Sequence, residues 1–180
     1  MNKQIPNALS ILRIFLSPGL LLIMDAPWAF AFLVLIAGAT DVADGYIARK
    51  YHLETSLGAK LDSIGDIVFY GVIMLVIWLR YDWVLKDNLI LLAVNVLLKA
   101  ATAVISRIKF GEIAFVHTLA NKLTGGIVFL SFLIIPFGVN EWVIKGLFLI
   151  AILAAAEELG IILKNKDVDL NQKSIFSDGK

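Results

Sequence analysis

The chain has 180 residues, of which 59% are hydrophobic and only 17% are charged, and its formal net charge is +1. Soluble domains carry charged residues at about a quarter of their positions. This composition therefore excludes an ordinary soluble protein and indicates an integral membrane protein. The near-zero net charge gives no reason to expect a nucleic-acid partner. The absence of cysteine excludes disulfides and thiolate chemistry.

Six apolar segments follow one another along the chain. A helix needs about 20 apolar residues to cross a bilayer, and each segment meets or approaches that length. The segments are expected at residues 5–24, 28–49, 61–79, 88–108, 114–136 and 142–163. Pro18 is expected to kink the first one. The predicted fold class is all-α, with a six-helix transmembrane domain over residues 1–164 and a polar C-terminal tail over residues 165–180.

The distribution of basic residues predicts the orientation in the membrane. Loops on the cytoplasmic side carry an excess of Lys and Arg. The N-terminus, the joints after the second and fourth segments, and the tail hold Lys3, Arg13, Arg49, Lys50, Lys60, Arg107, Lys109, Lys164, Lys166, Lys173 and Lys180. The opposite joints hold only Arg80, Lys86 and Lys145. Both termini are therefore expected in the cytoplasm, and the small size favours a multi-pass protein of a prokaryotic plasma membrane.

Four aspartates stand in one stretch between the second and third segments. Asp41 and Asp44 are spaced i, i+3, and Asp62 and Asp66 are spaced i, i+4, so each pair shares one face of a helix. The connection between the pairs is short, so the two helices are expected to be antiparallel neighbours with all four carboxylates converging. Charges at membrane depth are costly and mark function.

Clustered carboxylates need a cation. Like charges packed together disfavour ionisation unless a cation neutralises them, and all-oxygen ligands suit Mg²⁺ or Mn²⁺. Four acids suffice for two such ions, which is the arrangement used for phosphoryl displacement. Gly45 and Ala48 leave the helix face open, and Arg49 is placed to contact a phosphate.

The stretch resembles the signature of the CDP-alcohol phosphotransferase family. It reads Asp41-x2-Asp44-Gly45-x2-Ala48-Arg49-x8-Gly58-x3-Asp62-x3-Asp66, with every spacing of that motif. The opening IPNALSILRIFLSP is also similar to bacterial phospholipid-synthesising members. The resemblance implies a homodimer with six transmembrane helices per subunit. It also implies transfer of a substituted phosphate from a CDP-linked donor, such as CDP-diacylglycerol, to a small alcohol, with release of CMP.

The resemblance also implies roles for individual residues. Two Mg²⁺ or Mn²⁺ ions would be held by Asp41, Asp44, Asp62 and Asp66. The CDP site would be lined by Asp44, Gly45, Ala48, Arg49, Gly58 and Asp62. Asp66 would also act as the catalytic base that takes the proton from the acceptor hydroxyl. The acyl chains of the donor would lie among membrane lipid.

The acceptor alcohol stays open at this stage. Candidate acceptor-binding residues are Lys99, Arg107, His117, Asn121 and Lys122. They suit glycerol 3-phosphate or inositol phosphate. Phosphatidylglycerophosphate synthases usually show Asp-Pro-x-Ala-Asp-Lys, where this chain has Asp-Ser-Ile-Gly-Asp-Ile at residues 62–67, and that form is more similar to enzymes for serine and other amino alcohols. Glu157 and Glu158 either meet an amine or, as we favour, are interfacial charges.

Two other classes compete with the transferase. A divalent-metal transporter would use the same carboxylates, but it is expected to show broken helices or matching halves, and no second stretch resembles residues 41–66. A structural membrane subunit would have no reason to keep Gly45, Ala48 and Gly58 at these spacings beside four acids.

Overall fold

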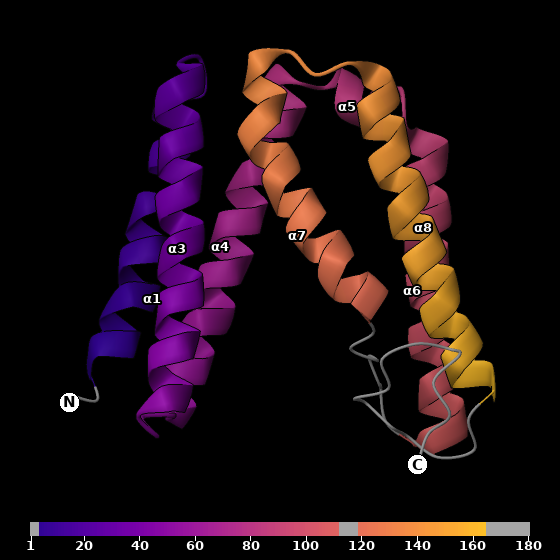
Figure 1. Ribbon diagram of the computed structural model, residues 1–180, viewed down its shortest axis with the longest axis horizontal. Coiled ribbons are helices and arrows are strands. Elements are labelled where there is room, and N and C mark those ends of the chain that lie inside the picture. Colours follow the sequence, from indigo (N-terminus) through magenta and orange to yellow (C-terminus); the bar gives the residue numbers. More distant parts are fainter. Residues whose placement is uncertain (1–3, 112–118, 165–180) are drawn as a thin grey trace. The chain divides into compact units, whose positions relative to one another are not determined.

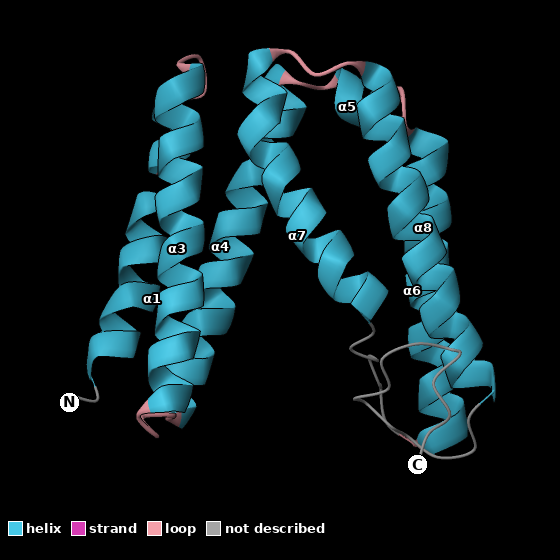
Figure 2. Cartoon of the chain, viewed as in Figure 1, coloured by secondary structure: helices cyan, strands magenta, loops and turns pink. Residues whose placement is uncertain are grey.

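The structure is a computed structural model of the chain, and it describes residues 4–111 and 119–164. These residues fold into helices joined by short connections, and no β-strand occurs among them (Figures 1 and 2). The helices are α1 (Gln4–Leu16), α2 (Gly19–Leu22), α3 (Pro27–Lys50), α4 (Ser56–Arg80), α5 (Trp83–Lys86), α6 (Leu89–Phe110), α7 (Leu119–Ile134), the 3₁₀ helix η1 (Ile135–Phe137) and α8 (Glu141–Lys164). The predicted all-α class is confirmed. His117 and the predicted tail at 165–180 lie outside the described residues.

Six helical stretches in the described parts of the chain are long and apolar enough to cross a membrane. Their bounds are Gln4–Leu22, Pro27–Lys50, Ser56–Arg80, Leu89–Phe110, Leu119–Phe137 and Glu141–Lys164. They match the predicted segments in number and order. Large apolar side chains such as Phe15, Trp28 and Ile108 are exposed on their surfaces, as expected for helices that face lipid. The cytoplasmic placement of both termini stays a prediction, and so does the single domain over residues 1–164.

Pro18 interrupts the first span where the sequence predicts a kink. Helix α1 ends at Leu16 and α2 begins at Gly19. Proline has no N–H to donate, and its ring clashes with the preceding turn. The carbonyl oxygen of Arg13, in the last turn of α1, accepts from both the backbone amide of Ser17 at 3.0 Å and its hydroxyl at 2.7 Å.

Helix α4 begins at Ser56, earlier than the expected residue 61. The reason is a helix cap: Thr55 has extended backbone angles, and its hydroxyl accepts a hydrogen bond from the Gly58 amide at 2.9 Å. A threonine in this position satisfies one of the unpaired amides of the first turn. Gly58 therefore lies on the same helix as Asp62 and Asp66.

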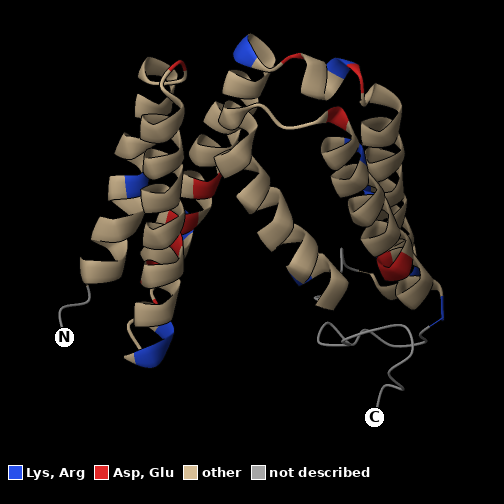
Figure 3. Cartoon of the chain, turned by 45° about the horizontal axis from the view of Figure 1, so that its top comes forward, with Lys and Arg blue, Asp and Glu red and all other residues tan. Residues whose placement is uncertain are grey.

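The chain forms two compact units. The first consists of α1 to α4 together with Phe132–Gly138, and the second contains α5, α6, most of α7, and α8. In the first unit, α1 packs against both α3 and α4. Buried apolar residues there include Leu20, Val34 and Ile73. Figure 3 shows acidic positions gathered among these packed helices, in ribbons that are otherwise largely uncharged.

The second unit is organised by the packing of α6 against α8. Ile161 and Ile162 of α8 are buried, and Ile105 and Phe110 of α6 pack against them. The ammonium of Lys109 donates to the carbonyl oxygens of Ile162 at 2.9 Å and of Leu163 at 2.8 Å. Carbonyls in the last turn of a helix lack partners within the helix, so Lys109 caps the C-terminal end of α8.

Candidate active site

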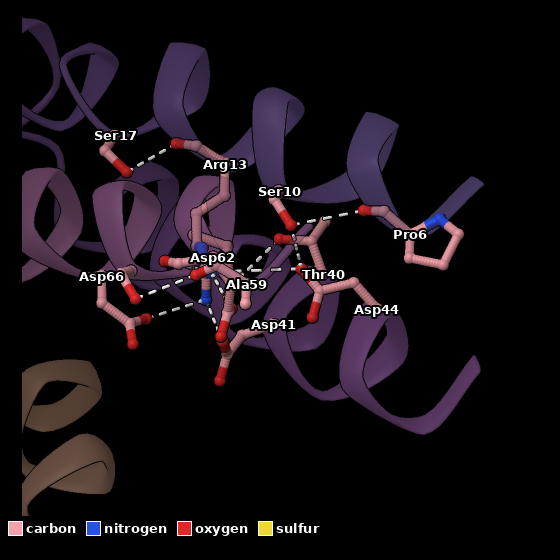
Figure 4. A network of polar contacts seen from close by, with 12 residues as sticks. Pro6, Ser10, Arg13, Ser17, Thr40, Asp41, Asp44, Ala59, Asp62 and Asp66 are labelled. Atoms are coloured by element: carbon pink, nitrogen blue, oxygen red, sulfur yellow. Dashed lines mark hydrogen bonds and ion pairs between the residues drawn. The ribbon is translucent and has the colours of Figure 1, made fainter. Parts of the chain in front are cut away.

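Three of the four predicted carboxylates meet in the first unit. Asp41 on α3 and Asp62 and Asp66 on α4 each offer one oxygen, and these oxygens all lie within 4.8 Å of one another. The three side chains are 45%, 48% and 46% exposed, respectively. The group is therefore open to a ligand on one side. The convergence occurs around α1, which packs against both helices (Figure 4).

Asp44 lies beside this group and has different surroundings. Its side chain is only 5% exposed. One of its oxygens accepts a hydrogen bond from the hydroxyl of Ser10 at 2.7 Å (Figure 4). Asp44 is not one of the three residues whose oxygens lie together, and its role as a metal ligand stays a prediction.

Arg13 lies at the centre of the aspartates. Its Nη1 contacts the carboxylate of Asp41 and lies 3.1 Å from Asp66, and its Nη2 lies 2.8 Å from Asp62 and 4.0 Å from Asp44. The side chain is 1% exposed. From the pattern of basic residues alone, Arg13 is one of the flanking charges that set orientation. The structure instead places it inside the site, as the buried cation of four carboxylates.

The sequence contains a pattern that indicates the buried position of Arg13. Pro6, Ser10, Arg13 and Ser17 follow one another at helical spacing, and all four are buried. A polar stripe at this spacing in an apolar helix predicts a face turned toward polar partners. The four aspartates are the only dense source of such partners in the sequence.

A cavity of about 230 Å³ adjoins the carboxylates. Its lining includes all six residues predicted to bind CDP, which are Asp44, Gly45, Ala48, Arg49, Gly58 and Asp62. The sequence analysis missed the other side of the cavity, where α1 supplies Pro6, Asn7 and Ser10. The α3–α4 connection and the first turns of α4 contribute further lining. The cavity thus brings together residues from three helices, and their role in binding CDP stays a prediction.

Two glycines shape the wall of this cavity. A Cβ at Gly58 would lie 2.8 Å from Oδ1 of Asn7, and a Cβ at Gly45 would lie 3.2 Å from Nη1 of Arg49. Without side chains, these positions let the Asn7 amide and the Arg49 guanidinium approach the helix backbone. Both polar groups are thereby held at the cavity, where a phosphorylated ligand would meet them.

The donor set fits divalent cations. The three grouped side chains offer only carboxylate oxygens, which Mg²⁺ and Mn²⁺ prefer over nitrogen or sulfur. Arg13 already supplies one positive charge to this group. The three grouped residues, with Asp44 beside them, would hold the ions, whose number stays a prediction.

The five predicted acceptor-binding residues fall in the second unit or outside the described residues. Lys99 donates to Glu158 at 2.5 Å and to Asn121 at 3.3 Å. The amide of Asn121 also donates to Glu158 at 3.0 Å. Arg107 donates to the carbonyl oxygen of Gly111 at the exposed end of α6. Lys122 is exposed, and His117 lies in the part of the chain that is not described.

Glu158 differs from its expected place. We favoured an interfacial charge for both Glu157 and Glu158, but the side chain of Glu158 is 1% exposed and pairs with Lys99. This interpretation of Glu158 was wrong because the sequence does not show which face of α8 meets α6. Lys99 and Asn121 do share one site, although their predicted contact with an acceptor is not tested by these contacts.

Comparison with protein families gives a match over most of the chain. The sequence profile described as CDP-alcohol phosphatidyltransferase matches residues 3–156. No solved structure gave a significant match.

Several curated bacterial proteins are similar over a shorter stretch. A CDP-diacylglycerol–glycerol-3-phosphate 3-phosphatidyltransferase of Cereibacter sphaeroides is 39% identical over 83 residues, which is 43% of this chain and 38% of the relative. The protein of the same name from Rickettsia bellii is 38% identical over 46% of this chain and 48% of its own length. The one from Escherichia coli is 29% identical over 56% of this chain and 59% of its own length. The match thus spans between about two fifths and three fifths of these relatives.

Proposed function

Because the chain belongs to the CDP-alcohol phosphatidyltransferase family, we propose that it transfers a phosphatidyl group from CDP-diacylglycerol to a small alcohol and releases CMP. The reaction belongs to phospholipid biosynthesis. The observation that carries the proposal is the cavity described above. Its lining contains the six motif residues expected around CDP, and one of these six, Asp62, is also one of the three grouped carboxylates.

The residues of the first unit have different proposed roles in this reaction. Asp41, Asp44, Asp62 and Asp66 would hold two divalent ions, which neutralise charge on the pyrophosphate when they are bound. The open helix face at Gly45 and Ala48 admits the nucleotide. Arg49 donates to a phosphate oxygen from the cavity wall. Ser10 holds Asp44 in a fixed orientation through its 2.7 Å hydrogen bond.

The proposed transfer requires one base. The acceptor hydroxyl oxygen attacks the phosphorus that bears the diacylglycerol, and the bond from this phosphorus to the bridging oxygen of the pyrophosphate breaks. CMP leaves with that bridging oxygen. The hydroxyl proton passes to the carboxylate of Asp66, which is suited to this role because its side chain is 46% exposed.

Glycerol 3-phosphate is the acceptor that we propose first. The support is the name of the three relatives described above, each of which is named for this acceptor. An amino alcohol is the second candidate, since the chain has Asp-Ser where synthases for glycerol 3-phosphate usually have Asp-Pro.

We also propose the location, orientation and oligomeric state of the enzyme. Six apolar helices support a multi-pass membrane protein. The excess of Lys and Arg in the joints near the motif supports a plasma-membrane location with the carboxylates facing the cytoplasm. A homodimer rests on the family resemblance alone.

The direct test is CMP release by purified protein in lipid or detergent. The protein would be given CDP-diacylglycerol and Mg²⁺ with glycerol 3-phosphate, serine, inositol phosphate, inositol and ethanolamine in separate reactions. We expect CMP with glycerol 3-phosphate and loss of that signal in Asp62→Asn. Asp25→Asn is the matched control, because Asp25 pairs with Arg80 and lies outside the motif.

The other outcomes separate the remaining alternatives. CMP formed with serine or ethanolamine alone would keep the reaction class and replace the acceptor. No CMP with any acceptor, together with no CDP binding by the folded protein, would contradict the proposal. Uptake of Mn²⁺ into vesicles that contain this silent protein would then support a divalent-metal transporter.

A further inference from the structure

Arg13 lies near more carboxylates than a basic residue that only flanks a membrane segment would require. The two Nη atoms of its guanidinium lie within ion-pair distance of four carboxylates, on α3 and α4. The third nitrogen, Nε, is buried and has no hydrogen-bond partner among the described residues. Leaving a buried donor unpaired is costly. The side chain is therefore held by its charge pairing with the acids.

The contacts use one oxygen of each grouped carboxylate. Arg13 meets Oδ1 of Asp41, Oδ1 of Asp62 and Oδ1 of Asp66. No described residue makes a hydrogen bond or ion pair with the second oxygen of these three side chains. One guanidinium against four carboxylates also leaves three negative charges unbalanced. The site is thus partly neutralised and still attractive to a cation.

The neighbouring helix is shaped to receive this guanidinium. A Cβ at Gly65 of α4 would lie 2.8 Å from Nε and 2.9 Å from Nη2 of Arg13. Only a residue without a side chain leaves room for the guanidinium against the helix backbone. On α1 itself, the Ser17 hydroxyl is turned to its own backbone, toward the carbonyl oxygen of Arg13. The buried position of Arg13 thus depends on α1, which carries it, and on Gly65 of α4, which leaves space for its guanidinium.

We propose that Arg13 is the resident counter-ion of the carboxylate group, and that it competes electrostatically with the divalent ions that the group binds. Without metal, its charge offsets the repulsion among the aspartates. When metal is present, the two kinds of cation repel each other across the same carboxylates. Each therefore weakens the hold of the site on the other. The role is one of positioning and of setting metal affinity, and it rests on the proposed function because it assumes a divalent-metal site.

This proposal predicts opposite effects on stability and on metal binding. Arg13→Gln removes the charge, so the metal-free protein should unfold at a lower temperature. The same variant should bind Mn²⁺ about tenfold or more tightly, because a nearby positive charge is gone. Arg13→Lys keeps the charge and should bind Mn²⁺ much as the wild type does. If Arg13 acted only by orienting the carboxylates with its planar fork, both variants would bind Mn²⁺ more weakly.

The test is a Mn²⁺ titration of the purified full chain in detergent, with free Mn²⁺ followed by electron paramagnetic resonance. Thermal unfolding with and without Mn²⁺ would be measured on the same samples. The set includes wild type, Arg13→Gln, Arg13→Lys, Asp62→Asn and Arg80→Gln. Arg80 is the matched control, since it is an arginine of the same unit whose ion pair with Asp25 is exposed.

The results distinguish this inference from the proposed function. Tighter Mn²⁺ binding by Arg13→Gln, with a larger stabilisation by Mn²⁺, is the expected result. Unchanged or weaker binding by Arg13→Gln, beside normal binding by wild type, would overturn the role of Arg13 alone. No binding by wild type would overturn the metal site itself. If Arg13→Gln folds only in Mn²⁺, the expected destabilisation has been seen, whereas failure to fold even in Mn²⁺ would contradict the inference.

Discussion

The two units each enclose an ionic cluster between helices, and the clusters differ in their balance of charge. In the first, four carboxylates surround one buried arginine. In the second, the buried Glu158 meets one lysine, Lys99, and one amide, Asn121. Among the described residues, one guanidinium faces four carboxylates in the first cluster, whereas one ammonium faces one carboxylate in the second.

This difference suggests how to distinguish a ligand site from a structural contact inside an apolar protein. A charge within a membrane segment needs a partner. A matched pair satisfies itself and ties its helices together. An unmatched group is stable only with a further cation, so it is expected to bind one. On this reasoning the first cluster is expected to bind ligands, and the second is expected mainly to connect α6, α7 and α8.

Removing the proposed base from the first cluster should affect activity most strongly. Asp66→Asn should lower the rate of CMP release by about 10²–10⁴-fold, which is the usual contribution of a general base. CDP binding should fall much less than turnover, because Asp66 does not line the cavity and the other three aspartates stay in place to hold the ions. Both would be measured on the same preparation, with Asp25→Asn as the control. Full turnover by Asp66→Asn would remove the base assignment.

The second cluster can be tested by removing the negative charge of Glu158. Glu158→Gln leaves Lys99 without its carboxylate, and breaking a buried pair costs about 3–5 kcal/mol. Lys99 is 40% exposed, so we expect a loss of only about 1–3 kcal/mol in unfolding free energy, because solvent screens its charge. The double variant Lys99→Met/Glu158→Gln should recover part of that loss.

The measurement for this pair is unfolding in detergent, followed by tryptophan fluorescence, together with Mn²⁺ binding. A structural contact predicts lower stability with unchanged Mn²⁺ affinity. Wild-type stability in Glu158→Gln, or a double variant less stable than the single one, would contradict the reading of a matched pair.

Two glycine substitutions on α4 test whether Arg13 packs against Gly65. Gly65→Ala places a methyl group against Arg13, and overpacking costs about 1–3 kcal/mol. Gly71→Ala is the matched control on the same helix, since nothing lies within 4 Å of its added Cβ. That control should be neutral or stabilising by up to about 1 kcal/mol, through helix propensity. Equal unfolding midpoints for the two variants would show that Arg13 is not packed against Gly65.

The smallest expected effect concerns the start of α4, which carries Asp62 and Asp66. Thr55→Ala removes the cap on the Gly58 amide and should cost about 1 kcal/mol. Thr55→Ser keeps a hydroxyl and should stay close to the wild type. Unfolding measurements in parallel decide this point, and equal stability of the alanine and serine variants would show that the cap does not matter.

The sequence predicted the six helices and the approach of three of the four acids, because these depend mainly on local patterns. Apolar length fixed the six spans, and i, i+3 and i, i+4 spacings placed each pair of aspartates on one face. Pro18 likewise acts on its own turn. The start of α4 was misplaced because Thr55, a polar residue, was assigned to the connection, whereas it caps the helix.

The places of Arg13 and Glu158 could not be predicted in the same way. Arg13 lies in the middle of the first apolar segment, on a polar stripe, and Glu158 lies beside Glu157 toward the end of the last segment. Neither pattern shows which other helices the residue meets. Arg13 is buried because α1 packs against both α3 and α4, and Glu158 because α8 packs against α6. Such contacts depend on tertiary packing, which spacing along one helix does not show.

The most direct test of the central claim is a reversal experiment on CMP release. Wild-type protein would turn over CDP-diacylglycerol and glycerol 3-phosphate in Mg²⁺, then receive excess EDTA, then excess Mn²⁺. If the unbalanced carboxylates bind the catalytic ions, CMP release should stop on chelation and resume with Mn²⁺, and Asp62→Asn should stay silent throughout. CMP release that continues at an unchanged rate in EDTA would contradict the account.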